Sequence, residues 1–250
     1  MRVLLTLALA VLTLAVPSPA IAQNPNAADR ERAVVQNRLG WDYMKTETFD
    51  KAAAAFQAAI DIDPTFEVPY YGLGRADMAL KKYLSAIAAY VKCRDLYESR
   101  AGQRFANAQD AQRYRQDRLT EIDEQIRQVN AMPPSIQQQD MLRQVSNQRR
   151  DVQDAITRGN DMSLDATVPP WVSLALGSAY FRSGKLADAE REYKATIAAD
   201  AKSGEAHNNL AVVYLETGRF AEAEASVKAA KKAGFKVHPQ LEQDIRNRKK

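Results

Sequence analysis

The clearest pattern in the chain is a helical spacing of apolar and polar positions that recurs in separate stretches. Residues 169–195 and 204–230 each read as an amphipathic segment, a turn and a second amphipathic segment. Gly184 and Gly218 occupy the same place in these two stretches, 34 residues apart. Apolar residues at intervals of three and four predict helices. The pattern therefore predicts consecutive helix–turn–helix units.

Two more units with the same plan precede these. A small residue recurs at Gly40, Gly74, Gly177 and Ala211. Alanine recurs at 52, 86, 189 and 223, and a large side chain at 56, 90, 193 and 227. The small residues would let two helices approach closely, and the large side chains would fill the space between them. Four units in one register predict an all-α protein built from stacked repeats.

These positions resemble the tetratricopeptide repeat, a helix–turn–helix unit of about 34 residues. The resemblance covers residues 33–100 as repeats one and two and residues 169–237 as repeats three and four. It implies a right-handed superhelix, with residues 238–250 as a C-terminal capping helix and basic tail. Pro239 suits the first position of that helix. The pattern departs at Glu47 and Lys81, which stand where repeats three and four have a turn glycine.

Residues 101–168 interrupt the repeats. Two apolar seams, one on each side of the segment AMPP, predict a long antiparallel helical hairpin that resembles a coiled coil. Their members are Leu119, Ile122, Ile126 and Val129, followed by Leu142, Val145, Val152 and Ile156. The alternative is two decayed repeats, because Gly74 and Gly177 are separated by 103 residues, one more than three periods.

The first 22 residues have the plan of a signal peptide. Arg2 precedes an apolar run from Val3 to Val16, and Ala20 and Ala22 form a small-x-small cleavage site. The run is shorter than the roughly 20 residues that span a bilayer. We therefore expect cleavage after residue 22, a linker at 23–32, and an exported protein, periplasmic or secreted, without a stable membrane anchor.

The net charge and the absence of catalytic motifs exclude several classes of function. The net charge is +4, and residues 101–166 carry one more acidic than basic residue, so we expect no nucleic-acid partner. The chain has a single cysteine, Cys93, and two histidines, His207 and His238. No catalytic motif, phosphate loop or metal-ligand spacing is present. We therefore predict a non-enzyme with no catalytic, cofactor or metal residues; the alternative is an unrecognised envelope hydrolase.

The resemblance also implies a binding surface, because such superhelices are lined on their concave face by residues of each first helix. The implied groove is apolar and aromatic with a few polar points. Its candidate residues are Asn37, Trp41, Met44, Tyr71, Arg75, Met78, Trp171, Leu174, Phe181, Asn208 and Val212. The alternative is that neighbouring helices or the hairpin cover the aromatic side chains, since apolar residues at helical spacing usually belong to a core.

Together these features predict a scaffold or adaptor of the bacterial cell envelope that binds a protein or an extended peptide in its concave groove. The alternative is a structural homodimer that assembles through the hairpin, residues 101–166.

Overall fold

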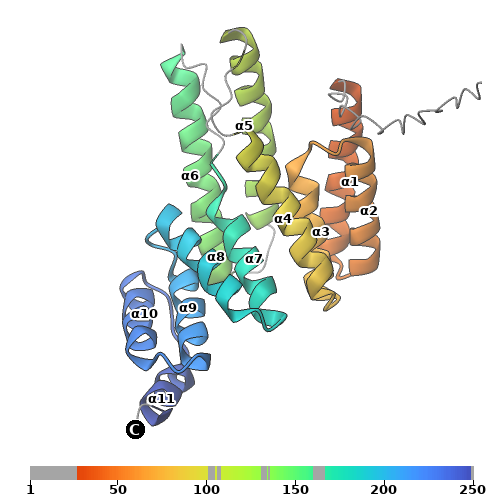
Figure 1. Ribbon diagram of the computed structural model, residues 1–250. Coiled ribbons are helices and arrows are strands. Elements are labelled where there is room, and N and C mark those ends of the chain that lie inside the picture. Colours follow the sequence, from red (N-terminus) through yellow and green to blue (C-terminus); the bar gives the residue numbers. More distant parts are fainter. Residues whose placement is uncertain are drawn as a thin grey trace, which may run out of the picture.

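The computed structural model describes residues 27–100, 105, 108–130, 134, 136–159 and 167–248 (Figure 1). The predicted signal peptide, linker residues 23–26 and the last two lysines of the basic tail lie outside the described residues. The described part is helical throughout and contains no strand. The helices are α1 (Ala27–Lys45), α2 (Phe49–Ile62), α3 (Glu67–Ala79), α4 (Tyr83–Arg100), α5 (Ala108–Asn130), α6 (Ile136–Arg158), α7 (Pro170–Arg182), α8 (Leu186–Ala199), α9 (Gly204–Glu216), α10 (Phe220–Lys232) and α11 (Pro239–Arg248).

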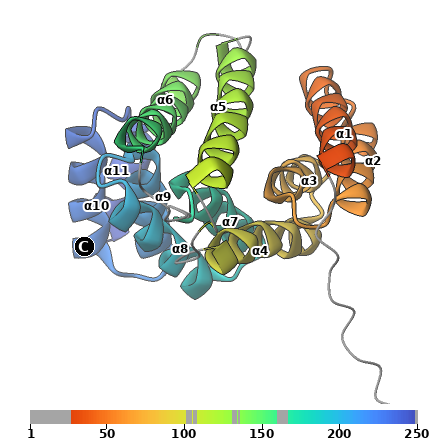
Figure 2. The ribbon, with the colours of Figure 1, turned by 90° about the horizontal axis from the view of Figure 1, so that it is seen from above.

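Eight of these helices form four antiparallel pairs that stack into one superhelix. The pairs are α1–α2, α3–α4, α7–α8 and α9–α10. The second helix of each pair packs against the first helix of the next, so α2 meets α3, α4 meets α7, and α8 meets α9. Because α4 packs directly on α7, the stack continues across the region that interrupts the repeats. Figure 2 shows the same order of helices from above.

Polar contacts join the two halves of the stack where α4 meets the third pair. Arg94 on α4 donates a hydrogen bond from Nη1 to Oε1 of Glu192 on α8, over 3.3 Å. Arg182, at the end of α7, donates from Nη2 to the hydroxyl of Tyr83 over 3.0 Å. The Glu192 side chain is only 5% exposed, so this ion pair is shielded from solvent.

The close helix approach predicted from the recurring small residues is present in the structure. A Cβ atom added to Gly40 would lie 2.6 Å from ring atoms of Phe56, and one on Gly177 would lie 2.7 Å from Tyr193. Real Cβ atoms do not approach other atoms that closely, so glycine is needed at both places. The large side chain of the second helix therefore fills the space that the glycine of the first helix leaves.

The turns between paired helices explain the departures at Glu47 and Lys81. Gly184 and Gly218 have φ angles of 78° and 73°, in the left-handed region that glycine adopts without strain. Glu47 and Lys81 occupy the same turn position with φ angles of 54° and 60°. The backbone of the first two turns therefore follows that of the last two, at a conformational cost that glycine would avoid.

In the sequence, helices α5 and α6 come between the second and third pairs. In space they pack on each other and project from the stack (Figure 1). Each has 23 residues, whereas a repeat helix such as α7 has 13. Leu119, Ile122 and Val145 are buried between them. Arg149 on α6 also donates from Nε to Oδ1 of Asp123 on α5 over 2.7 Å. The described residues here contain no pair of repeat-sized helices, which the alternative of decayed repeats would require.

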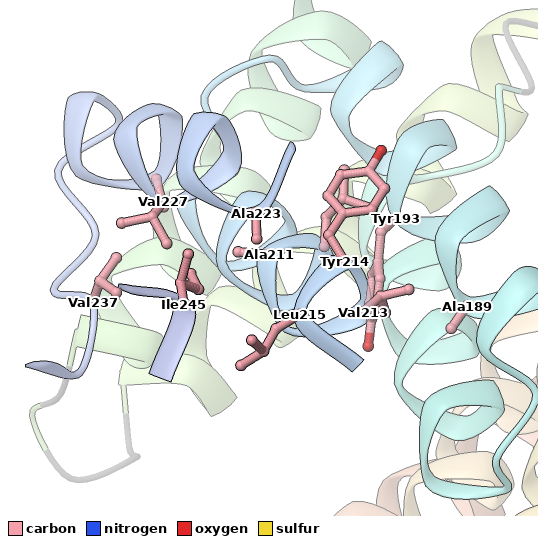
Figure 3. Packing of buried hydrophobic residues seen from close by; sticks show 12 residues of the cluster. Ala189, Tyr193, Ala211, Val213, Tyr214, Leu215, Ala223, Val227, Val237 and Ile245 are labelled. Atoms are coloured by element: carbon pink, nitrogen blue, oxygen red, sulfur yellow. The ribbon is translucent and has the colours of Figure 1, made fainter. Parts of the chain in front are cut away.

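The C-terminal end of the stack is closed by α11, which begins at Pro239. Ile245 and Val237 are buried against the cluster formed by α8, α9 and α10 (Figure 3). Leu241 packs on the same cluster from the partly exposed side. The other residues of α11 are mostly polar, so this helix caps the last repeat.

Cys93, the single cysteine of the sequence, is buried. Among the described helices, none combines the length and the apolar content needed to cross a bilayer.

Candidate functional site

The eleven candidate groove residues all lie on the first helices of the four pairs. They come from α1, α3, α7 and α9. Every one of them is half-buried, neither enclosed in the core nor fully exposed. The alternative that neighbouring helices cover the aromatic side chains therefore applies only in part. We call this set of residues the first-helix surface.

Three aromatic side chains form a row across the first three pairs. The ring of Tyr71 on α3 lies between those of Trp41 on α1 and Trp171 on α7. The ring centroids are 6.2 Å apart for Trp41 and Tyr71, and 4.3 Å apart for Tyr71 and Trp171. The second contact is edge to face, a preferred arrangement of aromatic pairs. Residues separated by 130 positions in the sequence are thus brought into one surface feature.

The repeat core supports this row from beneath. Phe56 packs edge to face on Trp41 with ring centroids 5.2 Å apart, and Tyr90 lies 5.6 Å from Tyr71. Phe56 and Tyr90 are the buried residues that fill the space beside the helix glycines. The half-buried aromatic rings therefore rest on side chains that the fold holds in place, which limits their rotation.

Arg75 places a permanent positive charge next to the aromatic row. Its Nη1 donates to the hydroxyl of Tyr71 over 3.4 Å, and its guanidinium lies 5.9 Å from the Tyr71 ring centroid. The pKa of Arg75 is raised from its ordinary value, mainly by electrostatic interaction with Tyr71 and also by the carboxylate of Glu205 on α9. The side chain is therefore charged at every physiological pH.

The remaining candidates add apolar contacts and amide groups. Leu174 and Phe181 on α7 pack against the cluster that includes α9. Asn208 donates from Nδ2 to the side-chain oxygen of its neighbour Asn209 over 3.3 Å. The side-chain oxygen of Asn37 is enclosed and accepts no hydrogen bond. The surface thus combines aromatic and apolar side chains with the positive charge of Arg75.

Sequence reasoning missed the residues that connect this surface to the hairpin helices. Tyr97, near the end of α4, packs edge to face on Trp171 with ring centroids 6.2 Å apart. Arg118 on α5 donates from Nη2 to the Tyr97 hydroxyl over 3.2 Å. Tyr97 falls after the last recurring position of its repeat, so the repeat pattern carries no signal for it.

A cavity of about 750 Å³ lies where the hairpin helices meet the stack. Its lining includes Tyr97, Tyr114, Arg115, Arg118, Arg150, Arg158, Val168 and Asp200. Among the described helices, α5 and α6 have close backbone contacts only with each other. Long side chains such as Arg118 therefore connect these two helices to the stack.

Two buried carboxylates of the described part, those of Asp63 and Glu192, pair with arginines. Asp63 meets Nε of Arg30 at 2.7 Å, and Glu192 meets Arg94. Burial raises the pKa of Glu192, an effect that Arg94 and Arg191 oppose. No group of three or more His, Cys, Asp or Glu side chains in the described residues could hold a metal ion. These carboxylates hold helices together, as their partners lie on other elements.

Comparison with known proteins agrees with the repeat architecture. Residues 33–66 and residues 174–234 each match a sequence profile described as tetratricopeptide repeat. No curated protein sequence matches the chain. Among solved structures, MamA is similar to it with a TM-score of 0.52 and 16% identity, over 83% of this chain and 81% of that chain. This likeness shows a shared fold.

Two further solved structures cover most of the chain at lower similarity. One is PilW, described as a widely conserved type IV pilus biogenesis factor, with a TM-score of 0.42 and 16% identity over 87% of this chain and 86% of that chain. The other is PilF of Pseudomonas aeruginosa, with a TM-score of 0.34 and 14% identity over 89% of this chain and 88% of that chain.

Proposed function

Since the chain belongs to the tetratricopeptide repeat family, we propose that it is a non-enzymatic adaptor that binds a protein or an extended peptide through its first-helix surface. The row of Trp41, Tyr71 and Trp171 is the observation that carries this proposal. Trp, Tyr and Arg are the residue types that most often dominate the energy of protein interfaces. Here two tryptophans, a tyrosine and Arg75 lie together on one surface.

The support beneath the row favours binding. Phe56 and Tyr90 fix the rings from below, so a partner that packs on Trp41 and Tyr71 has little side-chain freedom to immobilise. Immobilising a flexible side chain on binding costs about 1 kcal/mol. A surface that is already ordered avoids most of this cost, which favours a measurable affinity even for a short segment.

The charge of Arg75 favours a partner with an acidic group. Arg75 offers a charged donor beside the aromatic row, and charged hydrogen bonds are the stronger kind. An extended peptide with an apolar or aromatic residue next to a carboxylate would use both features.

We place this adaptor in the bacterial cell envelope. The basis is the signal-peptide plan of residues 1–22, which predicts export before the chain folds. Secretion of the reporter alkaline phosphatase, fused after residue 22 and compared with a fusion that lacks the apolar run, would test this placement. Equal reporter activity in both fusions would remove the envelope from the proposal.

The binding test begins with capture. The chain from Gln23 onward contains every described residue and is immobilised to retain partners from a bacterial envelope extract. The captured partner is then titrated by calorimetry against Tyr71→Ala, Trp171→Ala and a control, Leu84→Ala. Leu84 is 68% exposed on α4 and does not belong to the first-helix surface.

We expect each aromatic variant to weaken binding by about 2 kcal/mol, close to thirtyfold, as for interface hot spots. The Leu84 variant should bind as the parent does. Equal affinity for the parent and both aromatic variants, with unchanged helical circular dichroism, would place the binding site elsewhere.

A homodimer through residues 101–166 stays a prediction. The exposed large apolar side chains of the described residues are Val35, Leu39 and Leu84, and none of them lies on α5 or α6. The outer faces of these two helices carry mainly Gln, Arg, Asn and Asp. The adaptor is therefore the function that the described surface supports best.

A further inference from the structure

The outer face of α1, at the N-terminal end of the described superhelix, carries two exposed apolar side chains. Val35 is 59% exposed and Leu39 is 38% exposed, and they are one turn apart on this helix. Helices α2 and α3 cover only the other side of α1. At the opposite end of the stack, α11 covers the last pair with Ile245 and Leu241. Terminal repeats normally carry a polar outer face, so two exposed apolar side chains on this face of the described helices call for an explanation.

Several exposed positions of α1 follow the spacing of a coiled-coil seam. They alternate at intervals of four and three residues, which places them in one line along a helix. On α1 the seam consists of Ala28, Arg32, Val35, Leu39 and Asp42, and all five are exposed, as are Glu31, Arg38 and Lys45 beside it. Such a seam normally faces a second helix.

The seam is complementary to itself when two copies run antiparallel. About a centre midway between Val35 and Leu39, Val35 faces Leu39 of the partner subunit. Arg32 then faces Asp42 of the partner subunit, and the mirrored contact occurs on the other side of the axis. A twofold interface requires one patch that matches its own copy in this way.

We propose that α1 is a self-association surface, on which a second copy of this chain packs antiparallel about a twofold axis. The two central apolar pairs exclude water, and the two Arg–Asp pairs on either side fix the register. This surface lies outside the adaptor's first-helix surface, so the inference does not depend on the proposed function.

The present partners of the charged residues do not prevent this pairing. Arg32 is bonded to Asp29 at 2.6 Å, and Lys45 is bonded to Asp42 at 3.1 Å. Both pairs are between exposed side chains one turn apart, and such pairs are each worth about 0.5 kcal/mol. Exchanging them for contacts across the axis therefore costs little.

The small area of this surface implies a weak dimer. One helix face is a small interface, below the roughly 800 Å² per partner of a stable complex. Arg38 lies beside the seam, and the two copies of this residue approach each other at the axis, which opposes association. We therefore expect a reversible dimer that forms at high protein concentration.

Dimerisation leaves the first-helix surface open. Asn37 and Trp41 point away from the seam, and the Trp41 ring contacts Tyr71 on α3. A dimer would present two copies of this surface in one particle. Two linked sites retain a multivalent partner far better than one, because the second contact forms within the complex.

Sedimentation equilibrium of the chain from Gln23 onward, over a wide range of concentrations, tests the proposal. The variants are Leu39→Glu, Arg32→Asp, Asp42→Arg and the double variant Arg32→Asp with Asp42→Arg. Leu84→Glu is the control, because it places the same charge at an exposed leucine far from α1. Thermal unfolding followed by circular dichroism confirms that each variant is folded.

The parent and the Leu84 variant should share one dissociation constant. Leu39→Glu should raise the dissociation constant by at least about tenfold, because it buries a charge at the apolar centre of the interface. Each single charge reversal should raise it by a similar factor, because it places like charges opposite each other across the axis. The double variant should return it to near the parent value, since the pair is restored with its signs exchanged. A parent that is monomeric at all concentrations overturns the proposal. A dimer that ignores Leu39→Glu, or a double variant that fails to recover, overturns it as well.

Discussion

Gly177 on α7 and Tyr193 on α8 occupy complementary space, because a Cβ atom on Gly177 would lie 2.7 Å from Cε1 of the tyrosine ring. The same relation joins Gly40 to Phe56 in the first pair. In the fourth pair, the corresponding residues are Ala211 and Val227, both buried. A methyl group on the first helix is therefore compatible with the fold only when the opposing side chain is smaller.

Gly177→Ala should destabilise the protein by about 1–2 kcal/mol, because overpacking a rigid ring outweighs the better helix propensity of alanine. Urea unfolding followed by circular dichroism measures the change. Combining Gly177→Ala with Tyr193→Val recreates the Ala211–Val227 pair. The double variant should then lose less free energy than the sum of the two single variants. Simple additivity would show that the ring and the glycine do not compete for space.

Glycine at the left-handed turn positions should stabilise the first two repeats. Glu47→Gly and Lys81→Gly should each raise the free energy of unfolding by about 1 kcal/mol, because a side chain in this region of φ is strained. Gly184→Ala is the reverse change and should lower it by a similar amount. The same urea measurement applies, and destabilisation by either glycine substitution would contradict this explanation of the turn.

Asp63→Asn should remove an ion pair that fixes the start of α1. Asp63 is fully buried, and its Oδ2 lies 2.7 Å from Nε of Arg30, while Oδ1 accepts a hydrogen bond from the Thr65 backbone N–H. We expect a loss of about 2 kcal/mol, as for breaking a largely buried pair. Asp61→Asn, at an exposed position two residues earlier, is the matched control and should change the melting temperature very little.

Glu190 and Glu192, on the same helix, should affect stability in opposite directions as the pH changes. Burial raises the pKa of Glu190, but hydrogen bonds from Lys194 and Arg219 outweigh it, so the pKa lies below its ordinary value of 4.5. Its stabilising effect is therefore present above pH 4.5 and is lost as the pH falls through the lower value. Glu190→Gln should cost about 1 kcal/mol at neutral pH and nothing in strong acid.

Glu192 has a raised pKa, because burial outweighs the opposing charges of Arg94 and Arg191. Its contribution to stability is therefore fully present below pH 4.5 and is lost as the pH rises through the folded-state pKa. The variant Glu192→Gln should gain stability relative to the parent over that rise. Melting temperatures of both glutamine variants across this pH range test the pair, and parallel curves for the two would contradict it.

The repeat positions predicted from sequence are the ones that core geometry constrains. Gly40, Gly177 and the opposing rings recur because two helices can pack this closely in few ways, so the spacing alone revealed the pairs. The four helix pairs follow from this periodic signal, whereas the capping helix follows from Pro239, which suits a first helical position. Glu47 and Lys81 depart from the repeat pattern in residue type, but their backbone has the same left-handed conformation as Gly184 and Gly218.

The candidate surface was predictable only in part. Trp41, Tyr71 and Trp171 were chosen by their repeat positions, and the structure places their rings in a row. Whether a partner binds there stays a prediction. Tyr97 and Arg118 lie outside the periodic positions, so the packing of Tyr97 on Trp171 and its hydrogen bond from Arg118 depend on how α5 is placed against α4. No local pattern encodes that geometry.

The direct packing of α4 on α7 has a consequence for the order of folding. The first two pairs and the last two pairs consist of contacts between chain neighbours, which form fast. Joining them requires Arg94 to reach Glu192, 98 positions further along the chain, and closing so long a loop costs entropy. The first two pairs and the last two pairs should therefore fold as separate cooperative units. Their docking through α4 and α7 is then the late, slow event that completes the native chain.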